Sequence, residues 1–158
     1  MVQPLPQNTR LRKEAICPDG RFEIRQHVRA GAFGIVYRAI NHEPSPDEPA
    51  EVVIKEYAPA DWVRRAGGNE NPYQLVLREG LGDETAAHEA DARESFLKEA
   101  RLLRRLRSKF VPRYFDAWAE PETGNLYCAM EDLGDVTLES VMRAALSWDE
   151  IRQIAIQC

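Results

Sequence analysis

The sequence predicts an α+β fold, because strand-like segments surround one long helical segment in a chain of 158 residues. The strand-like segments are rich in β-branched and aromatic residues and are bounded by Gly, Pro and Asn. They cover 21–29, 33–41, 51–57, 111–119 and 125–131. Apolar residues with a helical period cover the segment from about 84 to 107. We therefore expect five strands and one principal helix.

Two glycines three residues apart, Gly31 and Gly34, lie between the first two strand segments. Glycine tolerates positive φ and has no side chain, so a hairpin here can bring backbone N–H groups close to phosphates. Phe33 would cap the tip of such a hairpin, and Val36 would offer an apolar surface to a flat ring. A Gly-Xaa-Xaa-Gly sequence is also typical of a plain turn, so this feature alone does not decide between the two interpretations.

A lysine lies inside the apolar third strand segment. Strand alternation places Val53, Lys55 and Tyr57 on one face, and Val52 and Ile54 on the other. Burying an ammonium group among such residues costs free energy unless an anion meets it. A phosphate under the glycine hairpin would be such an anion.

The helical segment carries a glutamate on its apolar stripe. That stripe consists of Phe96, Ala100, Leu103 and Leu106. We expect Asp83 to be the N-cap. Glu99 has no cation three or four residues away, so an inward carboxylate here needs a remote partner, for which Lys55 is the candidate. The alternative is a half-exposed glutamate at the edge of the stripe.

The glycine hairpin, strand lysine and helix glutamate follow one another in the order found in protein kinases, and the sequence resembles the N-terminal lobe of a serine/threonine protein kinase. The resemblance spans residues 21–158. It implies a five-stranded antiparallel sheet with one long helix, then the first helices of a truncated C-lobe. The segment Ile54-Lys55-Glu56-Tyr57-Ala58-Pro59 is also similar to that of some bacterial serine/threonine kinases.

We expect three parts, the first from its prolines and lack of periodicity and the other two from the resemblance. Residues 1–20 would be a flexible leader, 21–131 the N-lobe, and 132–158 the hinge and the truncated start of the C-lobe. Within the N-lobe, 59–82 is an insertion, and residues 58–63 could begin a short helix there.

The resemblance also implies the site residues. Lys55 and Glu99 are the expected catalytic residues: Lys55 would bind the α- and β-phosphates of ATP, and Glu99 would hold Lys55. Met130 would guard the back of the adenine pocket, while the backbones of Glu131 and Leu133 would hydrogen-bond the adenine edge. The expected ATP-contacting residues are Val28, Gly31, Ala32, Phe33, Gly34, Val36, Val53, Lys55, Met130, Glu131 and Leu133.

The sequence departs from the family pattern in several places. Arg29 stands where the family's loop has its first glycine, and Val53 replaces a small residue. The His-Arg-Asp catalytic loop and the Asp-Phe-Gly metal motif do not occur in these 158 residues, and the hinge residues Asp132 and Asp135 cannot replace them. We expect the Mg²⁺ ligands beyond residue 158 and no metal site within this stretch, which alone should not transfer phosphate.

Three functions remain open at this point. The first is the ATP-binding part of an enzyme that transfers the γ-phosphate of Mg-ATP to a hydroxyl of an unidentified protein substrate. The second is a pseudokinase or truncated regulatory module, which would bind nucleotide or a partner kinase without catalysis. The third is a small-molecule kinase with a similar small lobe. An unrelated α+β domain with a chance glycine turn would require several ordered motifs to coincide.

The charge and hydropathy of the sequence limit the classes of binding partner and the cellular location that we expect. A net charge of −5, with 30% charged residues, argues against nucleic acid. No apolar run approaches a membrane span and no signal peptide is evident, so we expect a cytoplasmic protein. Cys17, Cys128 and Cys158 are expected to be reduced. The apolar residues within 148–158 would need cover from the rest of a C-lobe or from a partner chain.

The outer face of the helix is basic. It carries Arg101, Arg104, Arg105 and Arg107, with Lys109 just beyond. This pattern is either a docking patch for a phosphate or an acidic partner, or a solvated face whose charges suit the helix C-terminus. The second interpretation is the one that the pattern favours.

Overall fold

The computed structural model describes residues 20–66, 73–108 and 111–134. The predicted leader up to residue 19 and the predicted C-lobe segment from residue 135 lie outside the described residues. Eight elements occur in the order β1 (Phe22–Ala30), β2 (Gly34–Asn41), β3 (Glu51–Tyr57), β4 (Val63–Arg65), β5 (Leu75–Leu77), α1 (Asp83–Leu103), β6 (Tyr114–Ala119) and β7 (Leu126–Met130).

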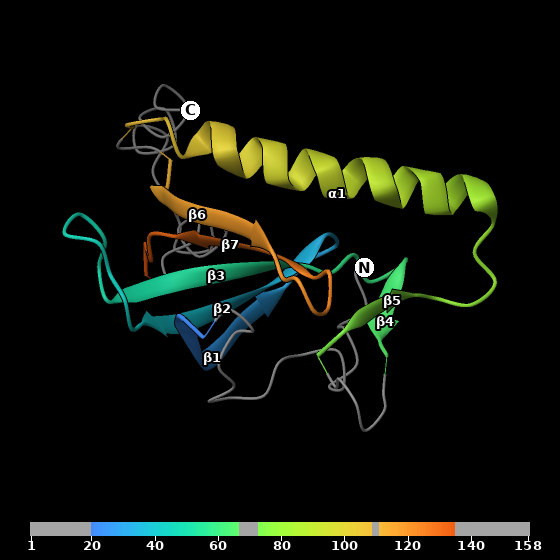
Figure 1. Ribbon diagram of the computed structural model, residues 1–158, viewed down its shortest axis with the longest axis horizontal. Helices are drawn as coiled ribbons and strands as arrows, with labels where there is room; N and C mark the ends of the chain where they lie inside the picture. Colours follow the sequence, from blue (N-terminus) through green and yellow to red (C-terminus); the bar gives the residue numbers. More distant parts are fainter. Residues whose placement is uncertain (1–19, 67–72, 109–110, 135–158) are drawn as a thin grey trace, which may run out of the picture.

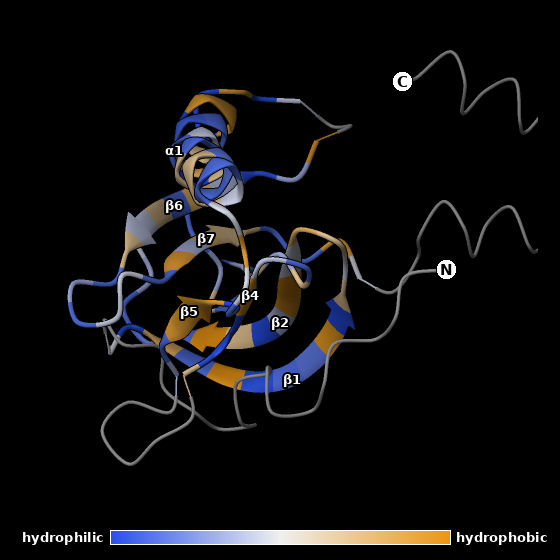
Figure 2. Cartoon of the chain, turned by 90° about the vertical axis from the view of Figure 1, so that its right-hand side faces the viewer, coloured by the Kyte–Doolittle hydropathy of each residue, from blue (hydrophilic) through white to orange (hydrophobic). Residues whose placement is uncertain are grey.

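Five strands form one sheet in the order β1-β2-β3-β7-β6, and every neighbouring pair is antiparallel. The helix α1 lies along β6 and β7, as Figures 1 and 2 both show. The predicted five-stranded antiparallel sheet with one long helix is therefore confirmed. Within the part of the chain that the structure describes, no helix is long and apolar enough to cross a membrane.

The two faces of β3 have different surroundings. Val52 and Ile54 are fully buried in the hydrophobic core, together with side chains from β1, β2 and β7. Val53 and Lys55, on the opposite face, are half-buried. This difference follows from the two-residue period of a strand, which sends alternate side chains to opposite faces.

The segment between β3 and α1 contains two short antiparallel strands, β4 and β5. A turn follows Pro59, whose carbonyl accepts hydrogen bonds from the N–H groups of Trp62 and Val63, and the chain then enters β4, which pairs with β5. The predicted short helix at 58–63 is wrong. The N–H groups of Ala58 and Ala60 donate instead to the carbonyls of Phe33 and Ala32 in the glycine hairpin. These hydrogen bonds hold the chain extended there.

A buried ion pair attaches this segment to the sheet. Both Glu56 side-chain oxygens accept from the guanidinium of Arg65, at 2.8 and 2.6 Å, and both side chains are almost completely inaccessible. Tyr37 and Tyr127 donate their hydroxyls to the same carboxylate, each at 3.2 Å. Burial alone lowers the pKa of Arg65, but the charge and hydrogen bonds of Glu56 outweigh that effect and leave the pKa above its usual value.

The helix α1 is shorter than predicted and less deeply buried. It begins after Gly82, which contributes no side-chain cap, so the prediction of Asp83 as the N-cap is wrong. It ends at Leu103, and Leu106 therefore lies beyond it and is 49% exposed. Of the predicted stripe only Ala100 is fully buried. The physical reason is that α1 packs against two strands at one side of the sheet, which covers only a narrow strip of the helix.

Candidate functional site

Two rows of residues cross the sheet on the face of Lys55. In the first row, Arg29 of β1 is the register partner of Val36 in β2, and Val36 is the partner of Lys55 in β3. Directly opposed residues of antiparallel strands place their side chains on the same face. The two cations therefore flank Val36 on one surface, with backbones about 10 Å apart, because adjacent strands are about 4.8 Å apart.

The second row lies two residues further along the strands. It joins Arg38 of β2, Val53 of β3, Met130 of β7 and Tyr114 of β6 through successive register pairs. Its central members, Val53 and Met130, are apolar. At its end, burial raises the pKa of Tyr114 to about 12. One end of this surface is thus suited to a flat apolar group, while the first row carries the cations.

The two rows form the wall of a cleft of about 480 Å³, which the segment after β7 closes on one side. The lining residues are Val28, Arg29, Val36, Arg38, Val53, Lys55, Pro112, Tyr114, Met130, Glu131, Asp132, Leu133 and Gly134. Seven of the eleven residues that the resemblance implied for ATP line it: Val28, Val36, Val53, Lys55, Met130, Glu131 and Leu133. Residues from β1 to the end of β7 thus come together around one hollow.

The glycine hairpin does not line this cleft. Gly31, Ala32 and Phe33 are exposed, and the Gly31 N–H donates to the Gly34 carbonyl at 2.8 Å. Neither glycine has a positive φ, so the conformational reason expected for them does not hold. Gly34 is required for another reason: a Cβ there would lie 2.4 Å from the backbone oxygen of Glu56. The close approach of β2 and β3 therefore needs a residue without a side chain.

Lys55 and Glu99 are not paired. In the described part of the chain no ion pair joins them, and Glu99 is exposed, so the prediction of an inward-pointing Glu99 is wrong. The Lys55 ammonium instead lies 5.6 Å from the centre of the Phe96 ring of α1. The buried thiol of Cys128 is the register partner of Lys55, and burial raises its pKa to about 12. The exposed carboxylate of Glu99 is still close enough to β6 and β7 for its charge to help raise the pKa of Tyr114 and Cys128.

The sequence did not predict a contact between β2 and the segment after β7, which both line the cleft. Arg38 Nε donates to Asp132 Oδ2 at 2.7 Å, and the other carboxylate oxygen of Asp132 accepts the N–H of Gly134 at 2.8 Å. The hydrogen bond from Arg38 holds the pKa of Asp132 below its usual value. Strand alternation from Val36 already places Arg38 on the cleft face, which was the available signal.

Backbone groups at the end of β7 are partly engaged. The Glu131 N–H donates to the Arg113 carbonyl at 2.8 Å, and the Arg113 N–H donates to Glu131 Oε2 at 3.1 Å. Among the described residues, no hydrogen bond engages the Glu131 carbonyl or the Leu133 N–H. One acceptor and one donor, two residues apart, are therefore available beside the apolar row.

Solved structures with this arrangement are protein kinases. The apo form of PpkA-294 matches with a TM-score of 0.68 and 28% sequence identity, over 85% of this chain and 43% of that one. The PknI kinase domain of Mycobacterium tuberculosis, in a double mutant, matches with a TM-score of 0.55 and 16% identity, over 87% of this chain and 42% of that one. The chain has the protein kinase fold.

The described sheet and α1 correspond to the N-lobe of that fold, and the chain spans less than half the length of the two kinase structures it matches. No protein-family model matches the sequence. No curated protein matches it either.

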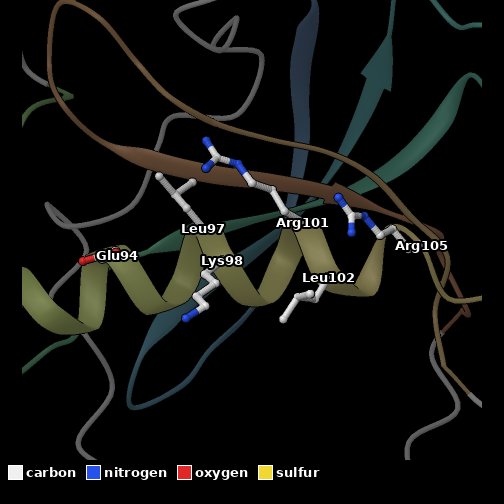
Figure 3. Close-up of a pocket in the computed structure, with 6 residues that line it drawn as sticks. All are labelled: Glu94, Leu97, Lys98, Arg101, Leu102 and Arg105. Carbon is white, nitrogen blue, oxygen red and sulfur yellow. The ribbon is translucent and has the colours of Figure 1, made fainter.

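A second, shallower hollow lies on the outer face of α1 of this kinase N-lobe. Figure 3 shows its six lining residues: Glu94, Leu97, Lys98, Arg101 and Leu102 of α1, and Arg105 just beyond it. It therefore contains two of the five cations in the predicted basic face. Arg107 differs, because its guanidinium donates to the carbonyl of Arg104, the C-cap of α1, and to that of Leu106 beyond the helix. This is how a cation suits a helix C-terminus.

Potential metal ligands do not gather in the described part of this N-lobe. No group of three or more His, Cys, Asp or Glu side chains there is placed to hold a metal ion. His42 instead contacts Glu23, with 3.0 Å between Nε2 and Oε2.

Proposed function

We propose that this chain is the ATP-binding part of a serine/threonine protein kinase, which transfers the γ-phosphate of ATP to a protein hydroxyl. The observation that carries the proposal is the cleft, in which an apolar row and a cationic row lie side by side. Such a surface can take a ligand with a flat base at one end and negative charge at the other. The kinase fold, together with 28% identity to PpkA, supports nucleotide as that ligand.

The base would bind at the row of Val53 and Met130. These side chains offer apolar contact to the faces and the rear edge of an adenine ring. The unengaged Glu131 carbonyl and Leu133 N–H would accept from and donate to its polar edge. No side chain is needed for this recognition, because an extended backbone already presents alternating donors and acceptors.

The phosphates would bind at the row of Lys55. An ammonium group meets phosphate as a compact point charge, and Lys55 lies at the centre of the sheet on the cleft face. Gly31 and Gly34 do not line the cleft in this structure, so the hairpin backbone would cover the phosphates only by moving over the row of Lys55. Mg²⁺ would neutralise charge on the transferred phosphoryl group. We assign no described residue to Mg²⁺.

In the proposed enzyme, Glu99 would pair with Lys55. Catalysis in the kinase family requires this ion pair, and the position of the helix controls it. The exposed Glu99 and the contact of Lys55 with Phe96 therefore describe a state that is not ready for transfer. The same observation favours a second candidate function, a pseudokinase or regulatory module that binds nucleotide or a partner kinase without catalysis.

A ligand-induced shift in thermal stability tests the nucleotide assignment. A ligand at 100 times its Kd stabilises the folded state by about 2.7 kcal/mol, which raises Tm by roughly 5–11 °C for a chain of this size. We expect ATP to produce such a shift in the 158-residue chain and none in Lys55→Met. Lys98→Met, on the outer face of α1, is the matched control and should keep the shift.

Unliganded Tm values of all three proteins show whether each variant is folded. An unchanged ATP shift in a folded Lys55→Met variant would remove Lys55 from the nucleotide site. If the complete protein, loaded with ATP and Mg²⁺, phosphorylates no protein mixture while the ATP shift persists, the regulatory module is the better assignment.

A further inference from the structure

The cleft wall holds a cation that the kinase pattern does not provide. Arg29 occupies the position of the first glycine of the family's loop, and its side chain lines the cleft. It is the register partner of Val36, as Lys55 is on the neighbouring strand. Arg29 and Lys55 therefore extend from the same face of the sheet, one on each side of Val36.

The other charged groups of the cleft are already engaged. The Arg38 guanidinium is held by Asp132 at 2.7 Å, and the Glu131 carboxylate accepts the Arg113 N–H at 3.1 Å. By contrast, neither Arg29 nor Lys55 has an ion-pair partner among the described residues. These two cations are thus the cleft groups with charge available to a ligand.

The position of the two cations matches the expected course of a nucleotide. The base site at Val53 and Met130 lies two residues along the strands from the row of Arg29, Val36 and Lys55, which is about 7 Å. A nucleotide with its base on the second row has its phosphates over the first row. Both cations can then reach the phosphate chain, Lys55 from β3 and Arg29 from β1.

We propose that Arg29 is a second phosphate-binding residue, which makes this cleft selective for nucleoside polyphosphates over nucleosides. The proposal rests on the nucleotide site proposed above. Its guanidinium would donate two N–H groups to phosphate oxygens, a geometry that suits arginine better than lysine. A hydrogen bond between charged groups of this kind corresponds to an about 10- to 100-fold change in affinity.

Calorimetric titration of the 158-residue chain with ATP, adenosine and inorganic tripolyphosphate tests this role. We expect Arg29→Met to bind ATP and tripolyphosphate about 10- to 100-fold more weakly and adenosine as tightly as the unmodified chain. Arg29→Lys keeps a cation and should retain most of the ATP affinity. Arg25→Met is the matched control, because Arg25 lies on the same strand, pairs with Glu23 and does not line the cleft.

Each contrary outcome has a distinct meaning. Unchanged ATP and tripolyphosphate affinity in Arg29→Met would overturn the role of Arg29 and leave the nucleotide site intact. Equal losses for ATP and adenosine would also overturn it, since Arg29 would then shape the base site. If the unmodified chain binds neither ATP nor adenosine nor tripolyphosphate, both this inference and the proposed function fail.

Discussion

The buried ion pair between Glu56 and Arg65 gives the sharpest prediction about how this N-lobe is held together. In Arg65→Met, the carboxylate of Glu56 keeps its two tyrosine hydroxyls but loses both guanidinium hydrogen bonds and the only charge that compensates it within the described residues. The segment that contains β4 and β5 also loses an internal bond, because the Arg65 guanidinium donates to the Tyr73 carbonyl as well.

The size of the effect follows from burial. Glu56 is completely inaccessible and the Arg65 side chain is 3% exposed, so solvent cannot replace the lost partner. Removing one partner of such a pair costs about 3–5 kcal/mol. For a chain of this size each kcal/mol lowers Tm by roughly 2–4 °C, which gives an expected fall of about 6–20 °C. The neighbouring Arg64 pairs with Glu79, which is 92% exposed, and its loss should barely change stability.

Urea unfolding of the unmodified chain, Arg65→Met and Arg64→Met measures the difference directly. Adding Glu56→Leu to Arg65→Met should recover much of the lost stability, because an uncompensated charge is no longer buried. Equal unfolding midpoints for Arg65→Met and Arg64→Met would refute the reasoning, since the buried pair would then contribute no more than an exposed one.

Three further predictions concern the cleft and its neighbours. Gly34→Ala should lower the free energy of unfolding in urea by about 1–3 kcal/mol, because its Cβ would meet the Glu56 carbonyl. Gly31→Ala should be tolerated, because no atom lies closer than 3.9 Å to a Cβ there. Equal effects of the two substitutions would contradict the role of close strand approach. Cys128 should resist alkylation at pH 8 until the chain is unfolded, since burial raises its pKa to about 12, and peptide mapping by mass spectrometry would show early labelling if this is wrong. The depressed pKa of Asp132 means that its bond to Arg38 stabilises the fold above the unfolded pKa of about 3.9 and is lost as pH falls below it. The stability advantage over Asp132→Asn, about 0.2–1 kcal/mol, should thus be constant from pH 5 to 8 and vanish in acid, and an advantage that persists at pH 2 would exclude the bond as its source.

Sequence periodicity was sufficient for the sheet. Alternation along β3 correctly separated the buried Ile54 from the cleft-facing Lys55, because a strand's two-residue period is independent of distant contacts. The kinase resemblance then supplied the antiparallel sheet and the single helix, both of which the structure confirms. It also indicated cleft residues as far apart as Val28 and Leu133, which lie around one hollow.

Side-chain contacts between distant parts of the chain could not be predicted from periodicity or from the resemblance. Nothing in the local sequence of Glu56 indicated that both of its carboxylate oxygens would accept hydrogen bonds from Arg65, nine residues later. The bond between Arg38 and Asp132 joins residues 94 positions apart. Glu99 was misplaced because a helical period shows which residues share a stripe but not how much of the stripe a neighbouring sheet covers.

The central claim is that nucleotide binds in the cleft with its base beside Leu133 and its phosphates beside Lys55. Titration of the ¹⁵N-labelled chain with ATP, followed by amide NMR shifts, tests it most directly. We expect the largest changes at the amides of Leu133, Val36 and Lys55, and we expect them to be lost in Lys55→Met. Shifts concentrated at Lys98 and Arg101 of the outer hollow on α1, with the cleft amides unmoved, would contradict it.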